Sequence, residues 1–169
     1  MADHVWSVFC YKGCIDRFTN QISLLDVIEE LMLAPNQLLS NAPPGSAFRI
    51  PCDIATLWLR SNLSTPERRR MRIRLVAPNG ISSDTSQGVI DVDLEATERC
   101  RTLLKMEGLP FWGEGLYRFI VELEGNNPDE WYQCAAIPLM VKIGDPAPVL
   151  ASVAAELPKP VAKKKRSRR

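Results

Sequence analysis

The chain has 169 residues, of which 46% are hydrophobic, enough for one packed domain and a tail. Its charges are divided unevenly. Residues 1–158 carry all 20 Asp/Glu and 14 Lys/Arg, a net charge of −6, whereas residues 159–169 carry seven Lys/Arg and no acid. No apolar run approaches the roughly 20 residues that cross a bilayer, and the start, MADHVWSVF, lacks the Lys/Arg of a signal peptide. We therefore expect a cytoplasmic protein with no membrane partner.

The cysteines favour reduced, mostly buried thiols over a disulfide framework. Their number is odd, their neighbours are largely apolar, and we expect no export signal. They are Cys10, Cys14, Cys52, Cys100 and Cys134.

Segments in which apolar and polar residues alternate, separated by turn signals, run along most of the chain and predict β-strands. The first segment, residues 5–16, is apolar on both faces at its start, as in a central strand. A proline-broken loop, residues 34–46, follows. Pro51 marks an edge, a bulge or a break, and Pro138 argues for an edge position. The later strand-like segments are residues 47–61, 68–80, 89–95, 113–124 and 131–143.

Two segments fit more than one structure. Residues 22–33, ISLLDVIEELML, have apolar residues at helical spacing, but the preceding Thr-Asn-Gln is typical of a hairpin connection. We favour a strand pair there. Residues 98–109, ERCRTLLKMEGL, fit a short helix or a strand equally well.

Two charged stripes stand out. Arg70, Arg72 and Arg74 alternate with apolar residues along one segment, and Asp91, Asp93 and Glu95 do so along the next. Opposite charges on adjacent strands stabilise pairing by about 0.2–1 kcal/mol each, so we interpret the stripes as a cross-strand ladder. A basic binding face and a hard-cation site on the acids are the alternatives.

The stretch GEGLYRFIVELEGNN, residues 113–127, is a strand with its corner. Tyr117, Phe119, Val121 and Leu123 fall on one face, and a tyrosine at the start of such a strand often bonds back to the preceding loop, as a tyrosine corner. Together the segments predict an all-β fold, an antiparallel β-sandwich of about seven or eight strands, immunoglobulin-like or similar. We assign it to residues 1–145, with a disordered Ala/Pro/Lys/Arg-rich tail at 146–169.

Three stretches, WSVFCYKGCID…TNQISLLDVIEEL, GEGLYRFIVEL and AAIPLMVKI, occur in an order that resembles a family of uncharacterised bacterial proteins of unknown function. Members of that family pair an N-terminal hairpin with a late Gly-x-Tyr-x-Phe strand. The resemblance covers roughly residues 5–143. It implies an intracellular β-sandwich and carries over no functional residue.

Signatures of catalysis and metal binding are weak. The one histidine, His4, is near the start, and neither a Gly-x-Ser-x-Gly elbow nor a phosphate loop is present. Cys10 and Cys14 would lie about 13 Å apart along an extended strand, too far to share a zinc ion unless the chain bends at Gly13. We therefore predict no enzyme, no cofactor and no metal. A small enzyme whose acid–base pair is hidden among the carboxylates is an alternative.

Two groups of residues are candidates for binding. Trp112, Trp131 and Tyr132 lie near turns and would suit a protein partner or a sugar, although such residues are often lids over a core. The tail is a cation cluster that would attract nucleic acid or another polyanion without sequence preference, unless it merely solubilises the chain. Its candidate residues are Lys163, Lys164, Lys165, Arg166, Arg168 and Arg169. We predict a non-enzymatic interaction or assembly module, with nucleic-acid association through the tail as the first alternative.

Overall fold

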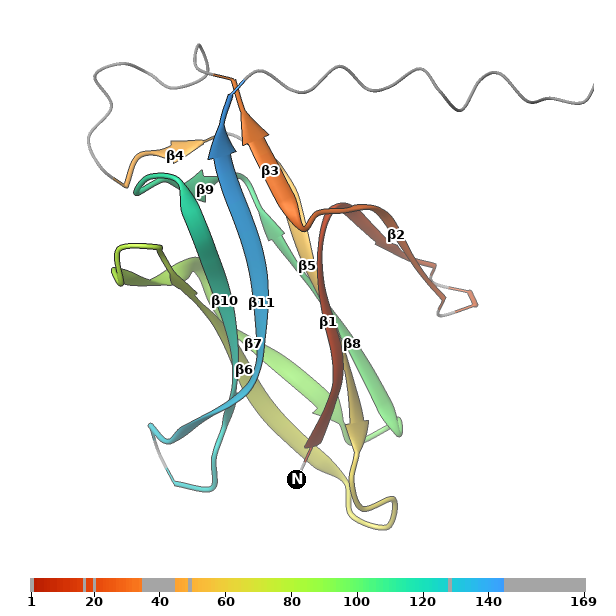
Figure 1. Ribbon diagram of the computed structural model, residues 1–169. Helices are drawn as coiled ribbons and strands as arrows, with labels where there is room; N and C mark the ends of the chain where they lie inside the picture. The colour runs from red at the N-terminus through yellow and green to blue at the C-terminus, as the bar shows by residue number, and fades with distance from the viewer. Residues whose placement is uncertain are drawn as a thin grey trace, which may run out of the picture.

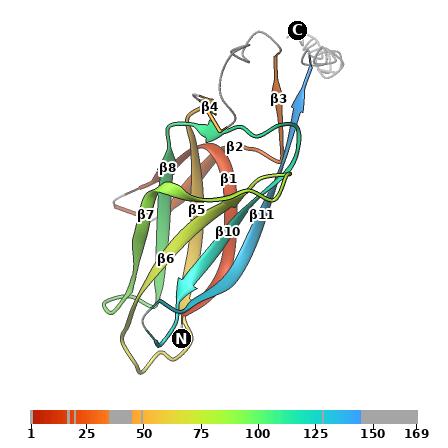
Figure 2. The ribbon, with the colours of Figure 1, turned by 90° about the vertical axis from the view of Figure 1, so that its left-hand side faces the viewer.

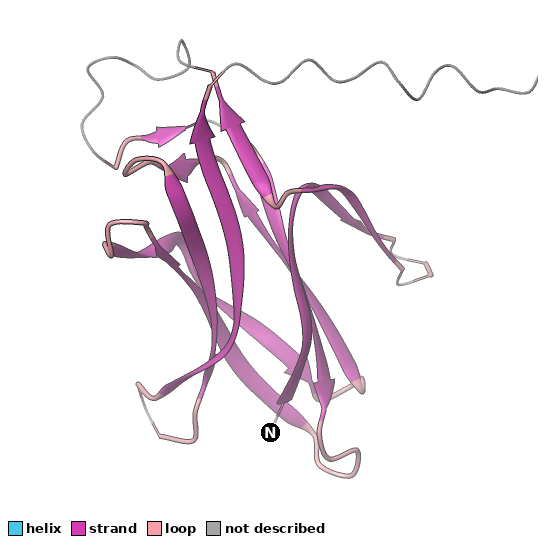
Figure 3. Ribbon diagram, viewed as in Figure 1, coloured by secondary structure: helices cyan, strands magenta, loops and turns pink. Residues whose placement is uncertain are grey.

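The computed structural model describes residues 2–16, 18–19, 21–34, 45–48, 50–127 and 129–144. These residues form eleven strands and no helix (Figures 1 and 3). The strands are β1 (Ala2–Ile15), β2 (Ile22–Val27), β3 (Glu30–Leu33), β4 (Ala47–Phe48), β5 (Cys52–Arg60), β6 (Glu67–Val76), β7 (Ser82–Leu94), β8 (Arg99–Met106), β9 (Leu109–Pro110), β10 (Gly115–Glu124) and β11 (Trp131–Ile143). The predicted tail, residues 146–169, lies outside the described residues.

The strands form two packed sheets, which confirms the predicted all-β sandwich (Figures 1 and 2). Sheet A has the order β2-β1-β5-β8, and sheet B has the order β3-β11-β10-β6-β7, with a small β4–β9 pair beside them. Strands β1, β5 and β8 follow the A-B-E order of an immunoglobulin sandwich, and β11, β10, β6 and β7 follow the G-F-C-C′ order. No helix among the described residues is long and apolar enough to span a membrane.

The strand interpretation of residues 22–33 is confirmed, but its two halves join different sheets. β2 pairs antiparallel with β1, and β3 pairs parallel with β11 from Met140 to Ile143. The chain changes sheet close to Asp26, whose φ of 52° lies in the left-handed region. Because β3 covers only the end of β11, Pro138 lies on a stretch that has β10 on one side and no strand of sheet B on the other. This is the edge position that its missing N–H predicts.

Alternating residues from both sheets fill the core, as the periodicity predicts. The largest fully buried side chains include Trp58 of β5 and Tyr117 and Phe119 of β10. Phe9 of β1 stacks on Phe119 across the sandwich, with ring centroids 4.9 Å apart. Residues 98–109, which fitted helix or strand, supply β8 and β9. More strands are present than predicted because residues 22–33 supply two and β4 and β9 are two residues each.

Candidate interaction surfaces

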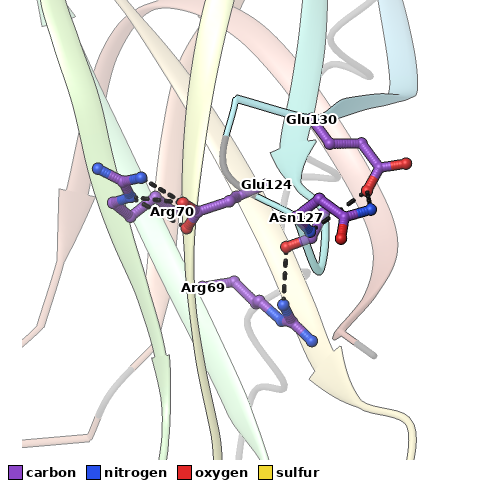
Figure 4. Close-up of polar contacts among 6 residues, drawn as sticks. Arg69, Arg70, Glu124, Asn127 and Glu130 are labelled. Carbon is purple, nitrogen blue, oxygen red and sulfur yellow. Dashed lines mark hydrogen bonds and ion pairs between the residues drawn. The ribbon is translucent and has the colours of Figure 1, made fainter.

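The arginine stripe lies on the outer face of sheet B, but its main partners are not the predicted acids of β7. β6 lies between β7 and β10, and most of its arginines turn toward β10. Arg72 Nε donates to Glu122 Oε2 at 2.7 Å, and Arg74 donates to Glu122 Oε1 at 2.9 Å. Arg70 Nε donates to both carboxylate oxygens of Glu124 at 3.0 Å (Figure 4). The ladder is therefore real, but its acids were assigned to the wrong neighbouring strand.

One bridge does join β6 to the acids of β7, but it comes from Arg68, which the prediction did not include, to Asp91. Asp93 instead accepts the backbone N–H of Glu95 at 2.9 Å, which closes the corner after β7. Among the described residues, no group of three or more His, Cys, Asp or Glu side chains is placed to hold a metal ion. The cation-site alternative thus has no geometric support.

Glu122 is the electrostatic centre of this face. Its side chain is only 8% exposed. Burial by itself would raise the pKa of Glu122, but the hydrogen bonds from Arg74 and Arg72 outweigh it and hold the pKa below its usual value. The Arg72 guanidinium also lies 4.4 Å from the ring centroid of Trp131, a cation–π contact. Because the arginines of β6 are paired, the predicted stripe offers little free positive charge, which weighs against a basic binding face there.

The turn aromatics do not form one site. Trp112 precedes β10, whereas Trp131 pairs with Glu124 at the opposite end of that strand. Ten residues of strand separate the two ends by roughly 30 Å. Trp112 packs against the core, Trp131 lies under Arg72, and Tyr132 is bonded to Glu130. These contacts match the lid interpretation better than a shared pocket.

The predicted tyrosine corner is present and fixes the loop that carries Trp112. The Tyr117 hydroxyl accepts the Trp112 N–H at 2.8 Å and donates to the Gly113 carbonyl at 2.8 Å. Burial raises the pKa of Tyr117, so the hydroxyl keeps its proton and can donate. The loop before β10 is therefore held by its own strand.

The corner between β10 and β11, at the other end of the sandwich, is held by Arg69. Its guanidinium donates to the Gly125 carbonyl at 2.9 Å and to the Asn126 side chain at 2.8 Å. Asn127 Nδ2 donates to Glu130 Oε2 at 2.9 Å within the same corner (Figure 4). These polar groups are already satisfied, so this end offers few free groups to a ligand.

Sheet A and its β1–β2 hairpin are different, because more than half of the exposed large apolar side chains lie on their strands and turn. Of the eleven large hydrophobic residues that are well exposed, six lie on β1, β2, β5 or the β1–β2 turn: Val5, Tyr11, Phe18, Leu25, Val27 and Leu59. The other five are scattered singly over loops and strands of sheet B: Met32, Leu63, Ile81, Val89 and Tyr132. Exposed apolar residues that cluster indicate a contact surface more strongly than isolated ones.

We call the lower part of this surface the sheet A face. It consists of Val5, Trp6, Leu57, Leu59, Arg99 and Arg101. The register places Trp6 opposite Leu57, Leu57 opposite Arg101, and Leu59 opposite Arg99, so these five side chains share one side of the sheet, whereas Val5 lies at the bulge between His4 and Trp6 and has no register partner. A shallow depression lined by Leu59, Thr97, Glu98 and Arg99 borders the face.

Four cations of sheet A lack the ion pairs that the arginines of β6 have, although Arg118, exposed on β10 of sheet B, also has none with a described residue. Lys12, Arg99, Arg101 and Lys105 form no ion pair with another described residue, whereas the arginines at 68, 69, 70, 72 and 74 all do. The Nε atom of Arg101 is buried without a hydrogen-bond partner in the described chain. A buried unsatisfied donor is rare in native proteins, so Arg101 lacks a hydrogen-bond partner of the kind that native proteins usually provide.

Beyond Cys10, β1 no longer pairs with β5 and continues as a hairpin with β2 (Figure 1). We call residues 10–15 together with β2 the hairpin arm. At its base, the Gly13 N–H donates to the buried Asp53 carboxylate at 2.7 Å. At its tip, the Asp16 carboxylate accepts the N–H groups of Phe18 and Thr19 at 2.8 and 2.7 Å, and Phe18 is 99% exposed. One carboxylate thus links the arm to β5, and another closes its turn.

The described residues show one contact of the kind used in catalysis. His4 Nε2 lies 2.7 Å from Ser7 Oγ, and the His4 ring packs edge-on against Trp58 at 5.1 Å. Burial lowers the pKa of His4. No hydrogen bond from a carboxylate to this ring is found within the described chain, and both residues lie on one strand. The contact resembles a satisfied core histidine more than a nucleophile and base.

Comparison with protein-family models, curated proteins and solved structures finds no match for this chain. The resemblance to a family of uncharacterised bacterial proteins stays a prediction. The sheet A face was missed in the sequence because its residues come from β1, β5 and β8, which are distant along the chain. The tail cations of residues 163–169 lie outside the described residues.

Proposed function

We propose that this protein is a non-enzymatic, cytoplasmic interaction module that binds another protein on the sheet A face. The partner surface that fits would carry carboxylates among apolar side chains. One observation supports the proposal above the others. The arginines of β6 on sheet B are paired, while sheet A combines exposed apolar side chains with four cations that have no ion pair among the described residues.

The residue types of the face suit such a contact. Tryptophan and arginine are enriched among residues that dominate binding energy, and here Trp6 and Arg101 are both half-buried on either side of Leu57. A carboxylate from the partner would give the guanidinium of Arg101 the ion pair that no described residue provides. Asp3 lies opposite Leu59, and Glu98 lines the adjacent depression, so both acids reduce the net positive charge of the face. We therefore expect apolar contacts to contribute most of the affinity and the cations to contribute specificity.

Photo-crosslinking in the cells that produce the protein tests this proposal. A photoreactive residue in place of Leu59 is expected to give a discrete adduct with another protein. Val89, similarly exposed on the outer side of β7, is the matched control, since the two residues are 39% and 47% exposed. The adduct from position 59 should weaken with Arg101→Gln and with rising salt. Equal labelling from positions 59 and 89 would contradict the proposal.

Nucleic-acid association through the tail is a second candidate function. The sequence favours it because seven cations lie in residues 159–169, and the pairing of the sheet B arginines leaves them as the densest free positive charge of the sequence. A salt titration with duplex DNA should give a log–log slope no steeper than about 6 for seven contacts. Chains ending at residue 158 should not bind, and binding by that truncated chain would contradict this candidate.

A further inference from the structure

We infer that β2 is an edge for strand addition by a second copy of this chain, so that two hairpin arms pair antiparallel through β2. This inference goes beyond the proposed function, because it uses the edge of the arm and leaves the sheet A face free. The result would be a four-stranded ribbon with the order β1-β2-β2-β1 across two molecules.

Edge strands in native proteins are usually guarded by charges, bulges or short length, because their open backbone groups invite pairing. The other three outermost strands here have such guards. β3 is four residues long, β8 carries Arg99, Arg101 and Lys105, and β7 carries Asp91 and Asp93 and has Gly88 at a φ of 67°. Residues 22–25 of β2, Ile-Ser-Leu-Leu, contain no charge and no proline. Although β2 ends its extended run at Asp26, which is charged and has a positive φ, residues 22–25 carry neither a charge nor a bulge and so form the least guarded stretch among the outermost strands of sheets A and B.

The hairpin geometry shows which backbone groups of β2 are open. The Asp16 N–H donates to the Gln21 carbonyl at 2.9 Å, so residues 16 and 21 are a hydrogen-bonded pair. In an antiparallel ladder such pairs alternate, which makes Ser23 and Leu25 the residues bonded to β1. The N–H and C=O groups of Ile22 and Leu24 consequently face away from β1.

One register satisfies these open groups in both copies. If a twofold axis passes beside Ser23, Ile22 of each copy lies opposite Leu24 of the other, and these pairs exchange four hydrogen bonds. Shifting the register by two residues places Ile22 opposite Asp26 in one direction, and Leu24 opposite residue 20, before the start of β2, in the other. At Asp26, a φ of 52° ends the extended run. The edge is thus self-complementary in a single register.

A second copy fits this edge better than a charged partner, because the uncharged strand meets an identical uncharged strand. The perpendicular twofold axis would also place Leu25 and Val27 of both copies on the same side of the ribbon, joining two exposed apolar patches. One six-residue strand is a small interface, so we expect a weak dimer whose population rises with concentration.

Disulfide trapping tests the register directly. In this register the two Ser23 residues form a non-hydrogen-bonded pair with Cα atoms about 4.5 Å apart, within the range that a disulfide spans. Ser23→Cys in a Cys14→Ser background should therefore give a disulfide-linked dimer under mild oxidation. Leu25→Cys is the matched control on the same exposed side of the arm. Its two copies would be offset by four residues, about 13 Å, and should not be linked quickly.

The expected result is dimer formation at least about tenfold faster for Ser23→Cys than for Leu25→Cys, since only the former meets the geometric limits of a disulfide. Ile22→Pro in the Ser23→Cys chain should abolish this difference and leave the thermal midpoint nearly unchanged, because the lost N–H faces away from β1. Equal rates for the two cysteine variants, or wild-type sedimentation that does not depend on concentration, would overturn the inference. Neither result affects crosslinking from position 59, so the proposed function would stand or fall separately.

Discussion

Replacing Glu122 tests whether the charged face of sheet B stabilises the sandwich. This carboxylate accepts hydrogen bonds from two guanidinium groups, at 2.7 Å from Arg72 and 2.9 Å from Arg74. Glu122→Gln keeps the shape of the side chain but removes its charge. The two arginines would then face an amide that can accept a hydrogen bond at one atom only.

The expected loss follows from burial. Hydrogen bonds to charged groups contribute about 1.5–3 kcal/mol each, so two of them set an upper limit near 6 kcal/mol. The arginine side chains are 31% and 33% exposed, and water will recover part of this energy when they are released. We expect Glu122→Gln to lower the free energy of unfolding by about 2–3 kcal/mol, between exposed and buried ion pairs.

Urea unfolding at several pH values measures this difference. Because the folded-state pKa of Glu122 lies below its unfolded value, its charge stabilises the protein above the ordinary glutamate pKa. That contribution is lost as pH falls through the lowered pKa, so wild type and Glu122→Gln should converge in acid. Glu124→Gln is the matched control. Its partner Arg70 is 53% exposed, and its cost should stay below about 1 kcal/mol.

A Glu122→Gln variant as stable as wild type at neutral pH would refute this reasoning. So would equal costs for Glu122→Gln and Glu124→Gln, because burial would then not decide the strength of these pairs. A difference that persists unchanged in acid would show that packing, and not charge, is responsible.

Two further predictions follow from the corner and from the thiols. Tyr117→Phe should cost about 1–2 kcal/mol of stability, because the Trp112 N–H loses its acceptor. Tyr117→Ala should cost about 3–5 kcal/mol, because it empties a core site. Thermal unfolding measures both costs, and a Tyr117→Phe variant as stable as wild type would show that the hydroxyl does not stabilise the loop. Cys14, which is exposed, should react first with a thiol reagent, while Cys10 and Cys52 stay slow, because burial raises both thiol pKa values, that of Cys52 to about 12. Rapid labelling of all five thiols in the native protein would contradict the second prediction.

The fold was predictable because its signals are local. Alternation within each segment identifies a strand, and the tyrosine corner needs only Tyr117 and the loop a few residues before it. The sheet change at residues 22–33 was not predictable, since both halves have strand-like composition and only their partners differ. Asp26, at a positive φ, lies at that change, but aspartate is common in turns and signals no change of sheet.

The surfaces were less predictable than the fold because they depend on which strands are neighbours. The sequence places the acids of β7 after the arginines of β6, so they are natural partners in a hairpin. In the sandwich β6 has a second neighbour, β10, and Glu122 is more buried there than any acid that an exposed β7 edge offers. A carboxylate in a drier site attracts the arginines more strongly, which explains why the ladder formed on the other side.

The pairing of β6 with β10 also affects which ligands the sandwich could bind. If β10 lacked its glutamates, the stripe on β6 would be a basic face and nucleic acid would be a natural ligand for the sandwich itself. With those glutamates in place, the unpaired cations that remain on the described sandwich lie mainly on sheet A, beside Trp6, Leu57 and Leu59. A phosphate backbone would meet apolar side chains there and the net charge of −6 of residues 1–158 around them. A protein surface with a few carboxylates among apolar groups would meet both the cations and the apolar side chains, which is why we propose a protein partner for the sandwich and consider a polyanion only for the tail.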